Sequence, residues 1–271
     1  MASPTNTNKR SPAVGRDPRK KKPRGEEEMT RRILAIDIGG TNVKMLASGE
    51  HEPLKVPSGR TMTPGRLVES VQDATKQWQF DGISIGYPGL VGADGPHSEP
   101  GNLGPGWVGF DFAAAFGKPV KIINDAAMQA LGSYAGGRML FLGLGTGLGS
   151  TLITQNVIVP LELGELPYSA NQRLGALVGR QGLKRVGKRE WRRIVTEMVD
   201  SFTRTFVVDY VVLGGGNAKL LKDLPSGARL GHNLTAFRGG FRLWHLADIR
   251  TLSPEGEVPG TKPAAADWRV V

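Results

Sequence analysis

The sequence predicts an α/β fold built from two similar halves. Along most of the chain, short apolar runs of the kind that form buried strands alternate with stretches of helical periodicity, which is typical of the α/β class. Two glycine-rich turns, Gly39–Thr41 and Gly145–Gly147, each lie between two apolar runs at corresponding positions of the two halves. Glycine accounts for 38 of 271 residues, about twice its usual share. We therefore expect a duplicated architecture in which glycine-lined backbone approaches a ligand.

The composition excludes several classes of protein. Hydrophobic residues make up 39% of the chain and charged residues 22%, which is ordinary for a globular chain in water. No apolar run reaches the roughly 18 residues that a transmembrane helix needs. The chain has no cysteine, which excludes a disulfide scaffold, a zinc finger, an iron–sulfur site and a cysteine nucleophile.

The first 32 residues form a basic segment that we expect to be disordered, because it has almost nothing apolar to bury. It contains ten Lys or Arg and four acidic residues, which leaves the rest of the chain with +4 of the net charge of +10. The run Arg19–Arg24 (RKKKPR) could bind nucleic acid or another polyanion through charge alone. The alternative is a solvated extension, or a start at Met29. The segment lacks the apolar stretch of a secretory signal, which favours a cytoplasmic location.

The first half is expected to open with a strand hairpin. Ile33–Ile38 (ILAIDI) is a short apolar run, Gly39–Asn42 is a tight turn, and Val43–Ser48 is the returning strand. Thr63–Trp78 has its apolar residues at helical spacing, which predicts an amphipathic helix.

Two further strands and a long loop complete the first half. Gly82–Gly89 predicts a strand that runs into a Gly/Pro break, and a loop rich in Gly and Pro extends from there to Trp107. Such loops are uncommon unless they are functional. Pro119–Ile123 predicts another buried strand, and Asn124 or Asp125 is expected to cap the helix that follows.

The second half repeats the pattern of hairpin, helix and strand. Met139–Ile153 (MLFLGLGTGLGSTLI) predicts a strand, a glycine turn and a second strand. Gln181–Phe206 predicts a long basic helix broken near Gly187, and Asp209–Leu213 a strand followed by a short helix that ends near Lys222. A last helix is expected over residues 234–247, interrupted by the glycines at 239 and 240.

The segment Asp37–Lys44 (DIGGTNVK) combines a strand-end carboxylate with two glycines and a threonine. The free N–H groups of such a turn, together with a hydroxyl group, can bind an anion. Asp37 would then hold a hydrated Mg²⁺ ion, because this ion prefers one or two carboxylates together with phosphate oxygens. The alternative is a β-hairpin turn that binds no ligand.

The segment Gly143–Ser150 (GLGTGLGS) contains a GxGxxG pattern in an unusual context. In a dinucleotide-binding fold this loop leads from a strand into a helix, whereas the run Ser150–Ile153 that follows here is typical of a strand. The chain has no GxxxxGK[ST] sequence, which excludes a P-loop. A second glycine hairpin facing the first would instead form a clamp around phosphates.

The segment Ile122–Gly132 (IINDAAMQALG) places a carboxylate directly after a buried strand. Asp125 could lie at the floor of a cleft and take a proton from a hydroxyl group. The alternative is that it only caps the helix, which is the commoner role of an aspartate at this place.

The predicted helix Gln181–Phe206 has a broad basic face. Its cations at helical spacing are Lys184, Arg185, Lys188, Arg189, Arg192 and Arg193. This face could guide a polyanionic phosphate donor through long-range attraction, which salt would screen. The alternative is a solvated helix face whose apolar side lies in the core.

In this order, the segments resemble those of the ROK sugar kinases of the actin/hexokinase superfamily, and most closely the short polyphosphate glucokinase type. Asp37–Lys44 resembles the first phosphate motif of the family, Ile122–Gly132 the segment with its catalytic aspartate, and Leu142–Ile153 its second phosphate motif. Its sugar loops and its adenosine-side glycine motif are similar to Tyr87–Val91 (YPGLV), Gly101–Trp107 (GNLGPGW) and Val211–Leu221 (VVLGGGNAKLL). The resemblance spans about Ile33–Trp244. It implies a duplicated actin-like (ribonuclease H-like) ATPase fold of two domains with an interdomain cleft.

The resemblance implies roles for individual residues. Asp125 is expected to be the general base that accepts the proton of a sugar hydroxyl as that hydroxyl attacks the terminal phosphoryl group. The residues expected at the sugar are Pro88, Gly89, Asn102, Asn124, Glu162 and Glu165. Those expected at the donor phosphates or nucleotide are Asp37 (also holding Mg²⁺ through water), Gly39, Gly40, Thr41, Asn42, Lys44, Gly145, Thr146, Gly147, Gly214, Gly215 and Gly216.

The chain departs from the family pattern at Glu162–Leu166 (ELGEL), where the family has E-x-G-H. Glu165 replaces a histidine that is expected to contact the sugar. It either accepts a hydrogen bond from a sugar hydroxyl or weakens sugar binding by repelling Glu162. The cysteines that hold structural zinc in many ROK proteins are absent, so no zinc is expected. The first 32 residues have no apolar periodicity and cannot form the helix–turn–helix of ROK repressors.

The expected activity is that of a glucokinase with inorganic polyphosphate, ATP or both as donor, Mg²⁺ as cofactor and the 6-hydroxyl of glucose or a related hexose as acceptor. A sugar-binding sensor with weakened catalysis is the alternative, because of Glu165. A homodimer is expected, without a membrane partner and with nucleic acid contacted only through the basic tail. The predicted division is a disordered basic tail (1–32), a small N-terminal domain (33–123), a large C-terminal domain (124–234), a helix packing back on the small domain (235–250) and a disordered tail (251–271).

Overall fold

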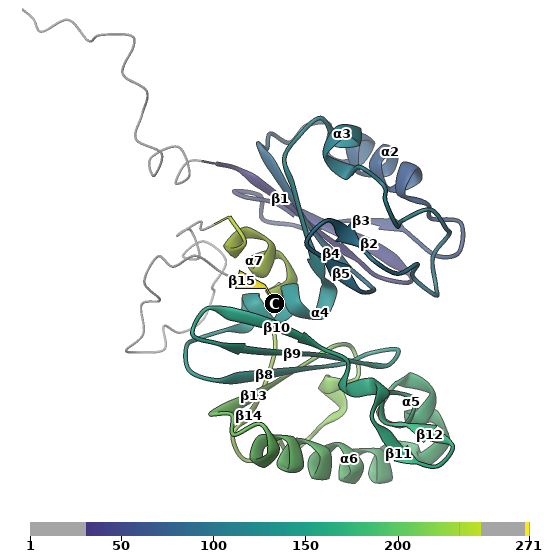
Figure 1. Cartoon of the computed structure of the whole chain (residues 1–271), viewed down its shortest axis with the longest axis vertical. Coiled ribbons are helices and arrows are strands. Elements are labelled where there is room, and N and C mark those ends of the chain that lie inside the picture. Colours follow the sequence, from purple (N-terminus) through teal and green to yellow (C-terminus); the bar gives the residue numbers. More distant parts are fainter. Residues whose placement is uncertain (1–30, 233, 245–268, 271) are drawn as a thin grey trace, which may run out of the picture.

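The first of two mixed sheets forms the centre of the N-terminal domain (Figure 1). The computed structural model describes residues 31–232, 234–244 and 269–270. The strands of this sheet are β1 (Ile33–Ile38), β2 (Asn42–Ala47), β3 (Leu54–Pro57), β4 (Gly82–Tyr87) and β7 (Val120–Asn124). Their order is β3-β2-β1-β4-β7, in which β1, β2 and β3 are antiparallel and β4 and β7 run parallel to β1.

The second sheet repeats this arrangement. Its strands are β8 (Met139–Leu144), β9 (Leu148–Thr154), β10 (Val157–Leu161), β13 (Tyr210–Gly214), β14 (Ala228–Leu230) and β15 (Arg269–Val270). Their order is β14-β13-β8-β9-β10-β15, in which β8, β9 and β10 are antiparallel and β13 and β14 run parallel to β8. The same meander followed by two parallel strands occurs in both sheets, so the predicted α/β class and its duplication are confirmed.

Helices cover both faces of each sheet. They are α2 (Pro64–Ala74), α3 (Phe112–Phe116), α4 (Asp125–Ser133), α5 (Leu174–Val178), α6 (Arg180–Thr205) and α7 (Thr235–Arg242), with the 3-10 turns η1 (Leu163–Glu165) and η2 (Ala218–Leu220). Two short hairpins, β5 (Val91–Gly92) with β6 (Gly95–Pro96) and β11 (Pro167–Ser169) with β12 (Gln172–Arg173), lie outside the main sheets. None of the helices in the described part of the chain is long and apolar enough to cross a membrane.

The elements stack in alternating layers of helices and sheets. Residues of α2 and α3 pack on one face of the first sheet, and residues of α5 and α6 on one face of the second. Helices α4 and α7 lie between the two sheets and pack on both (Figure 1). All six residues of β4 are buried, because a strand covered on both faces has no solvent side. The apolar runs predicted as buried strands follow from this layering.

Helices α4 and α7 cross at glycines. A Cβ atom on Gly132 would lie 1.8 Å from the carbonyl oxygen of Thr235, and one on Gly239 would lie 1.7 Å from that of Met128. The two backbones therefore approach more closely than any side chain would allow. The glycine at 239 was expected to interrupt the last helix, but Thr235–Arg242 is continuous because the glycines serve this close crossing.

Helix α7 and the two residues after it are hydrogen-bonded to the first sheet. The Ser84 hydroxyl of β4 donates to the carbonyl oxygen of Gly240 at 2.6 Å, and the indole N–H of Trp244 donates to the Ser84 oxygen at 2.8 Å. The ammonium group of Lys121 in β7 donates to the carbonyl oxygen of Leu243 at 2.8 Å. The domain boundaries predicted from the sequence stay a prediction, and residues 245–250 of the expected helix lie outside the described residues.

Three details of the sequence prediction are resolved by the structure. Helix α6 is interrupted at Gly187, whose φ of 78° and ψ of 161° are not helical, as expected. The short helix expected after β13 is only the 3-10 turn Ala218–Leu220. The prediction of a disordered tail over 251–271 was wrong at Arg269–Val270. These residues form β15 and pair with β10, because an edge strand offers free N–H and C=O groups.

Residues 1–30 of the basic tail lie outside the described residues.

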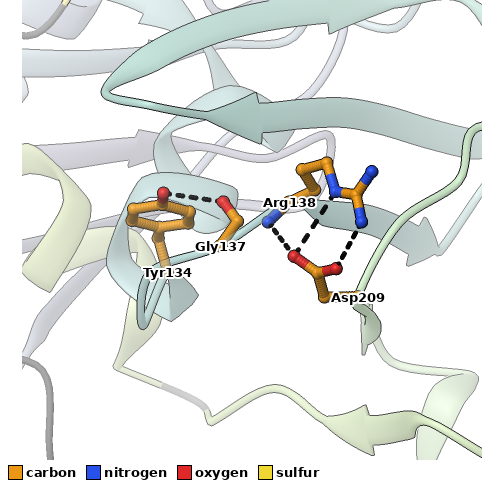
Figure 2. Close-up of polar contacts among 4 residues, drawn as sticks. All are labelled: Tyr134, Gly137, Arg138 and Asp209. Carbon is orange, nitrogen blue, oxygen red and sulfur yellow. Dashed lines mark hydrogen bonds and ion pairs between the residues drawn. The ribbon is translucent and has the colours of Figure 1, made fainter.

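An ion pair fixes the connection from α4 to the second sheet (Figure 2). The Asp209 carboxylate accepts from the guanidinium of Arg138 at 2.7 Å and from the backbone N–H of Arg138, also at 2.7 Å. The hydroxyl of Tyr134 donates to the carbonyl oxygen of Gly137 at 2.8 Å and closes the same turn. The hydrogen bond from Arg138 lowers the pKa of Asp209 below its ordinary value.

Replacing Asp209 should therefore cost stability in a defined pH range. Asp209→Ala removes the acceptor of both Arg138 groups, whereas Asp209→Asn keeps a neutral acceptor, so we expect the alanine variant to melt at the lower temperature. Because the folded pKa of Asp209 is depressed, its stabilising effect is present above about pH 4 and is lost as the pH falls through the folded pKa. Thermal unfolding at pH 7 and at about pH 3 checks this, and equal melting temperatures at pH 7 would contradict it.

Candidate active site

The first glycine turn joins β1 to β2 and lies under the loop that carries Asn102. The backbone N–H of Gly39 donates to the carbonyl oxygen of Asn42 at 3.1 Å, and the hydroxyl of Ser58 donates to the carbonyl oxygen of Gly39 at 2.6 Å. A Cβ atom on Gly40 would lie 2.0 Å from Nδ2 of Asn102. The predicted phosphate turn and the predicted sugar loop are therefore in direct contact, and a side chain on Gly40 would displace the amide of Asn102.

The second glycine turn joins β8 to β9 and is held from two sides. The backbone N–H of Arg180, at the start of α6, donates to the carbonyl oxygen of Gly145 at 3.0 Å. The side-chain amide of Asn217 donates to the same oxygen at 3.1 Å. Gly215 has a φ of +79°, and a Cβ atom there would lie 2.5 Å from the carbonyl oxygen of Leu144. The glycine run after β13 and the second glycine turn thus form one continuous backbone surface.

The first turn of α4 lies between strands of both sheets. A Cβ atom on Gly86 of β4 would be 3.4 Å from the Cα atom of Asp125, and one on Gly149 of β9 would be 2.9 Å from the Cβ atom of Ala126. Gly86 is paired with Asp37 in the first sheet. The start of α4 is therefore close to β4, the neighbour of the strand that leads into the first glycine turn, and to β9, the strand that leaves the second.

Three carboxylates act on one another in this region. Burial raises the pKa of Asp125 to about 7, and the charges of Asp37 and, more weakly, Glu162 contribute to this rise. Burial also raises the pKa of Asp37, while the ammonium group of Lys44, 4.0 Å from Asp37 Oδ2, lowers it. A carboxyl group with a pKa near neutral pH can both release and accept a proton there. Asp125 thus has the electrostatic character of an acid–base group.

The cap of α4 is Asn124, which answers the question that the sequence left open. Its Oδ1 accepts from the backbone N–H groups of Ala126 at 2.9 Å and Ala127 at 3.2 Å. Its Nδ2 donates to the carbonyl oxygen of Gly89 at 3.2 Å, which ties the predicted sugar loop to the helix. Asn124 is therefore the cap residue, and Oδ1 of Asp125 accepts a further hydrogen bond from the backbone N–H of Ala126 at 2.7 Å.

Glu162 and Glu165 belong to the second half of the chain and lie in the segment between β10 and β11. The Ser150 hydroxyl donates to the carbonyl oxygen of Leu161 at 2.7 Å and accepts from the backbone N–H of Leu163 at 3.0 Å, which fixes the backbone around Glu162. Burial, and then the charge of Glu165, raise the pKa of Glu162. The guanidinium of Arg173 lies 3.9 Å from Glu165 Oε2. Like-charge repulsion between the two glutamates is therefore present, and Arg173 counteracts it in part.

A cavity of about 690 Å³ lies beside this group rather than within it. It follows the outer edge of β7 and is lined by residues of the β5–β6 hairpin, α3, β10 and the end of α7. Among the residues that line it, Asn124 is the one that also belongs to the site. The carboxylates of Asp37, Asp125 and Glu162 are not part of its lining.

The acidic groups suit a cation that is held mainly by phosphate. Among the described residues, no cluster of three or more His, Cys, Asp or Glu forms a ready-made metal site. Asp37 and Asp125 are half-buried and close enough for the charge of Asp37 to raise the pKa of Asp125, so a cation bound here would favour their ionised forms. Mg²⁺ is commonly bound by one or two carboxylates together with substrate phosphates, and these residues fit that pattern.

One family model matches part of the chain. Residues 33–160 match the ROK family. The match covers both glycine turns and Asp125, so the ROK resemblance drawn from the motifs is confirmed.

Individual proteins and solved structures are similar over more of the chain. The chain is 25% identical over 206 residues to a polyphosphate glucokinase of Mycobacterium tuberculosis (strain CDC 1551 / Oshkosh), which covers 68% of this chain and 77% of that protein. The crystal structure of an inorganic polyphosphate/ATP-glucomannokinase from Arthrobacter sp. strain KM has a TM-score of 0.68 and 23% identity over 79% of this chain and 98% of its own. A ROK glucokinase from Streptomyces griseus in complex with glucose and AMPPNP has a TM-score of 0.62 and 16% identity over 78% of this chain and 98% of its own. The two-domain ROK fold is thereby established.

The structure also places residues that the sequence prediction missed. Ser58, Asn217 and Glu99 hold the first turn, the second turn and the sugar loop, respectively, through side-chain hydrogen bonds to backbone groups. Asn217 directly follows the glycine run, which was the one signal available for it. Ser58 and Glu99 reach their partners only through the fold.

Proposed function

We propose that this ROK protein is a sugar kinase that transfers a phosphoryl group from inorganic polyphosphate, ATP or both to the 6-hydroxyl of glucose. The observation that carries the proposal is the position of Asp125, which lies between the strands of the two glycine turns and has a pKa raised to about 7. The polyphosphate glucokinase relatives support the choice of reaction and donor. A cytoplasmic homodimer belongs to the same proposal.

In the proposed reaction, Asp125 accepts the proton of the sugar hydroxyl. The hydroxyl oxygen forms a bond to the terminal phosphorus of the donor, and the bond from that phosphorus to the bridging oxygen breaks. The shortened donor leaves with the electron pair of the broken bond, and the proton stays on Asp125 until solvent removes it. A base with a pKa near the working pH is well suited to this transfer, and positioning and charge stabilisation supply the rest of the catalysis.

The remaining residues would hold the two substrates. The backbone N–H groups and side chains of the first turn (Gly39, Gly40, Thr41, Asn42) and of the second (Gly145, Thr146, Gly147) would bind donor phosphates, with Lys44 adding a positive charge. Gly214, Gly215 and Gly216 would border a nucleotide. Asn102, Glu162 and Glu165 would bind sugar hydroxyls, with Asn124, Pro88 and Gly89 shaping the same pocket. Asp37 would hold Mg²⁺ through water, and the ion would neutralise charge on the transferred phosphoryl group.

An assay of glucose 6-phosphate formation with each donor tests the proposal. We expect turnover with polyphosphate, ATP or both in the presence of Mg²⁺, and loss of turnover when the metal is removed with a chelator. Absence of turnover with either donor would overturn the kinase proposal. If calorimetry then showed that glucose still binds, the sensor alternative would be favoured, because repulsion between Glu162 and Glu165 is the feature that could weaken catalysis.

The basic face of α6 predicts a preference for a long polyanionic donor. Arg180, Lys184, Arg185, Lys188 and Arg189 are exposed, and in the described part of the chain none of them forms an ion pair, whereas Arg193 pairs with Glu190 and Glu197. The first of these cations is Arg180, whose backbone N–H donates to the second glycine turn. A phosphate chain that leaves the turn could follow it.

Reversing two of these charges should weaken polyphosphate binding selectively. We expect Lys184→Glu/Lys188→Glu to raise the KM for polyphosphate about tenfold at low salt and much less at high salt, because surface charge interactions are screened. The KM for ATP should change far less. Lys76→Glu, a change at an exposed lysine just after α2 in the other domain, is the control. An unchanged KM for polyphosphate would mean that the face is merely solvated, and equal changes for the two donors would mean a general effect on the enzyme.

A further inference from the structure

We propose that Glu99 is a positioning residue that fixes the loop of Asn102 for binding of the acceptor sugar. This inference rests on the proposed function and adds to it a residue outside the motifs that the family resemblance covers. The Glu99 carboxylate accepts hydrogen bonds from three consecutive backbone N–H groups, those of Gly106 (3.0 Å), Trp107 (3.1 Å) and Val108 (3.2 Å). One exposed side chain thereby closes the loop on itself.

The three amides form a small anion-binding concavity that the chain fills with its own carboxylate. Successive N–H groups point to one place because Gly106 has a φ of +95°, a conformation that glycine adopts readily. A carboxylate has room for about four hydrogen bonds, and those to an ionised acceptor are about twice as strong as neutral ones. Three backbone N–H groups donate to the carboxylate of Glu99 here. Glu99 therefore acts on the loop and is not a free ligand for the sugar.

A second anchor, the side chain of Trp107, holds the same end of the loop whose amides bind Glu99. Trp107 is fully buried, its indole N–H donates to the carbonyl oxygen of Gly104 at 2.7 Å, and its ring packs against Tyr87 and Phe112 with centroid distances of 5.6 and 6.2 Å. The Tyr87 hydroxyl in turn donates to the carbonyl oxygen of Ser98, next to Glu99, at 2.6 Å. The ends of the loop are thus fixed by a carboxylate and by an aromatic cluster.

What these anchors place is Asn102. Its side chain is exposed, and its amide lies directly against Gly40 of the first glycine turn. A Cβ atom added to Gly40 would lie only 2.0 Å from Nδ2 of Asn102. The contact puts the amide of Asn102 between the proposed site of the acceptor sugar and that of the phosphoryl donor. Without the hydrogen bonds of Glu99, the glycine-rich segment between the anchors would gain conformational freedom, and sugar binding would have to order it again.

Glu99→Ala and Glu99→Gln test this role, with Asp111→Asn as the matched control. Asp111 also accepts a backbone N–H, that of Ala114 at 2.9 Å, but it caps α3 in the same domain and not the loop. We expect hydrogen exchange at the amides of residues 106–108 to become about tenfold faster in Glu99→Ala, less so in Glu99→Gln, and to stay unchanged in the control. The KM for glucose should rise about tenfold in Glu99→Ala while kcat changes less than about twofold.

The outcomes separate this inference from the proposed function. Faster loop exchange together with a higher glucose KM, partly restored in Glu99→Gln, supports it. Unchanged exchange, or faster exchange with an unchanged glucose KM, overturns it, and so does a fall in kcat at constant KM, which would mean a general loss of structure. If the wild type neither binds nor phosphorylates glucose, the proposed function fails and the sugar-binding role of the loop falls with it, whereas the exchange arm still reports whether Glu99 holds the loop.

Discussion

Asp125→Asn is expected to lower phosphoryl transfer by a factor of about 10² to 10⁴, because it removes the proposed general base and keeps the shape of the side chain. The asparagine can still accept the hydrogen bond that Oδ1 of Asp125 receives from the backbone N–H of Ala126 at 2.7 Å. Glucose should still bind, since Asn102 and Glu162 are unchanged. Rates from the glucose 6-phosphate assay and glucose affinity from calorimetry measure the two effects separately.

The same substitution is expected to stabilise the fold. The pKa of Asp125 is about 7 in the folded protein and 3.8 in its ordinary state, so ionisation is unfavourable in the native structure. A raised carboxyl pKa means that the destabilising effect is fully present above about pH 7 and disappears as the pH falls toward 4. Asp125→Asn should therefore melt above the wild type at pH 8, with the difference shrinking at pH 5.

The pH dependence of the rate follows from the same shift. Because the base must be ionised, wild-type kcat/KM should fall as the pH drops below about 7. Asp73→Asn, a change at an exposed carboxylate on α2, is the control for rate and stability. An active Asp125→Asn enzyme would contradict the role as base, and an inactive variant that melts below the wild type at pH 8 would indicate damage to the fold instead.

The strands and the glycine turns could be predicted from the sequence because their determinants are local. β1, β4 and β8 are buried apolar runs, and the turns after β1 and β8 are marked by glycine. The kink at Gly187 in α6 was predictable for the same reason. The duplication could be inferred because both hairpins repeat one local pattern, and the two sheets then share one strand order.

The contacts that assemble the site were not predictable, because they join distant segments. Nothing near Asn102 in the sequence shows that its amide lies against Gly40, and nothing near Glu99 shows three backbone amides turned toward it. The choice between Asn124 and Asp125 as the cap of α4 depends on where each side chain points, which only the structure gives. The expected break at residue 239 was wrong for a similar reason, since its glycine serves a contact with another helix.

That helix contact gives the second large expected effect: Gly132→Ala should strongly destabilise the protein. A methyl group at this position would lie 1.8 Å from the carbonyl oxygen of Thr235, 2.7 Å from its carbon and 2.8 Å from the backbone nitrogen of Gly239. All three atoms belong to the backbone of α7, so no side chain can turn away to make room. Overpacking of this kind costs about 3 kcal/mol or more, well above the roughly 1 kcal/mol that alanine gains over glycine in a helix.

The loss should extend to both domains, because α4 and α7 form the layer between the two sheets and α4 begins with Asp125. Denaturant unfolding measures it as a lower midpoint with an unchanged slope. Gly65→Ala is the matched control, since Gly65 is also helical and a Cβ atom there would meet nothing within 4 Å. If Gly132→Ala unfolded at the same midpoint as Gly65→Ala, the two helices could not cross as closely as the structure has them, and α4 would need another support to hold Asp125 between the strands.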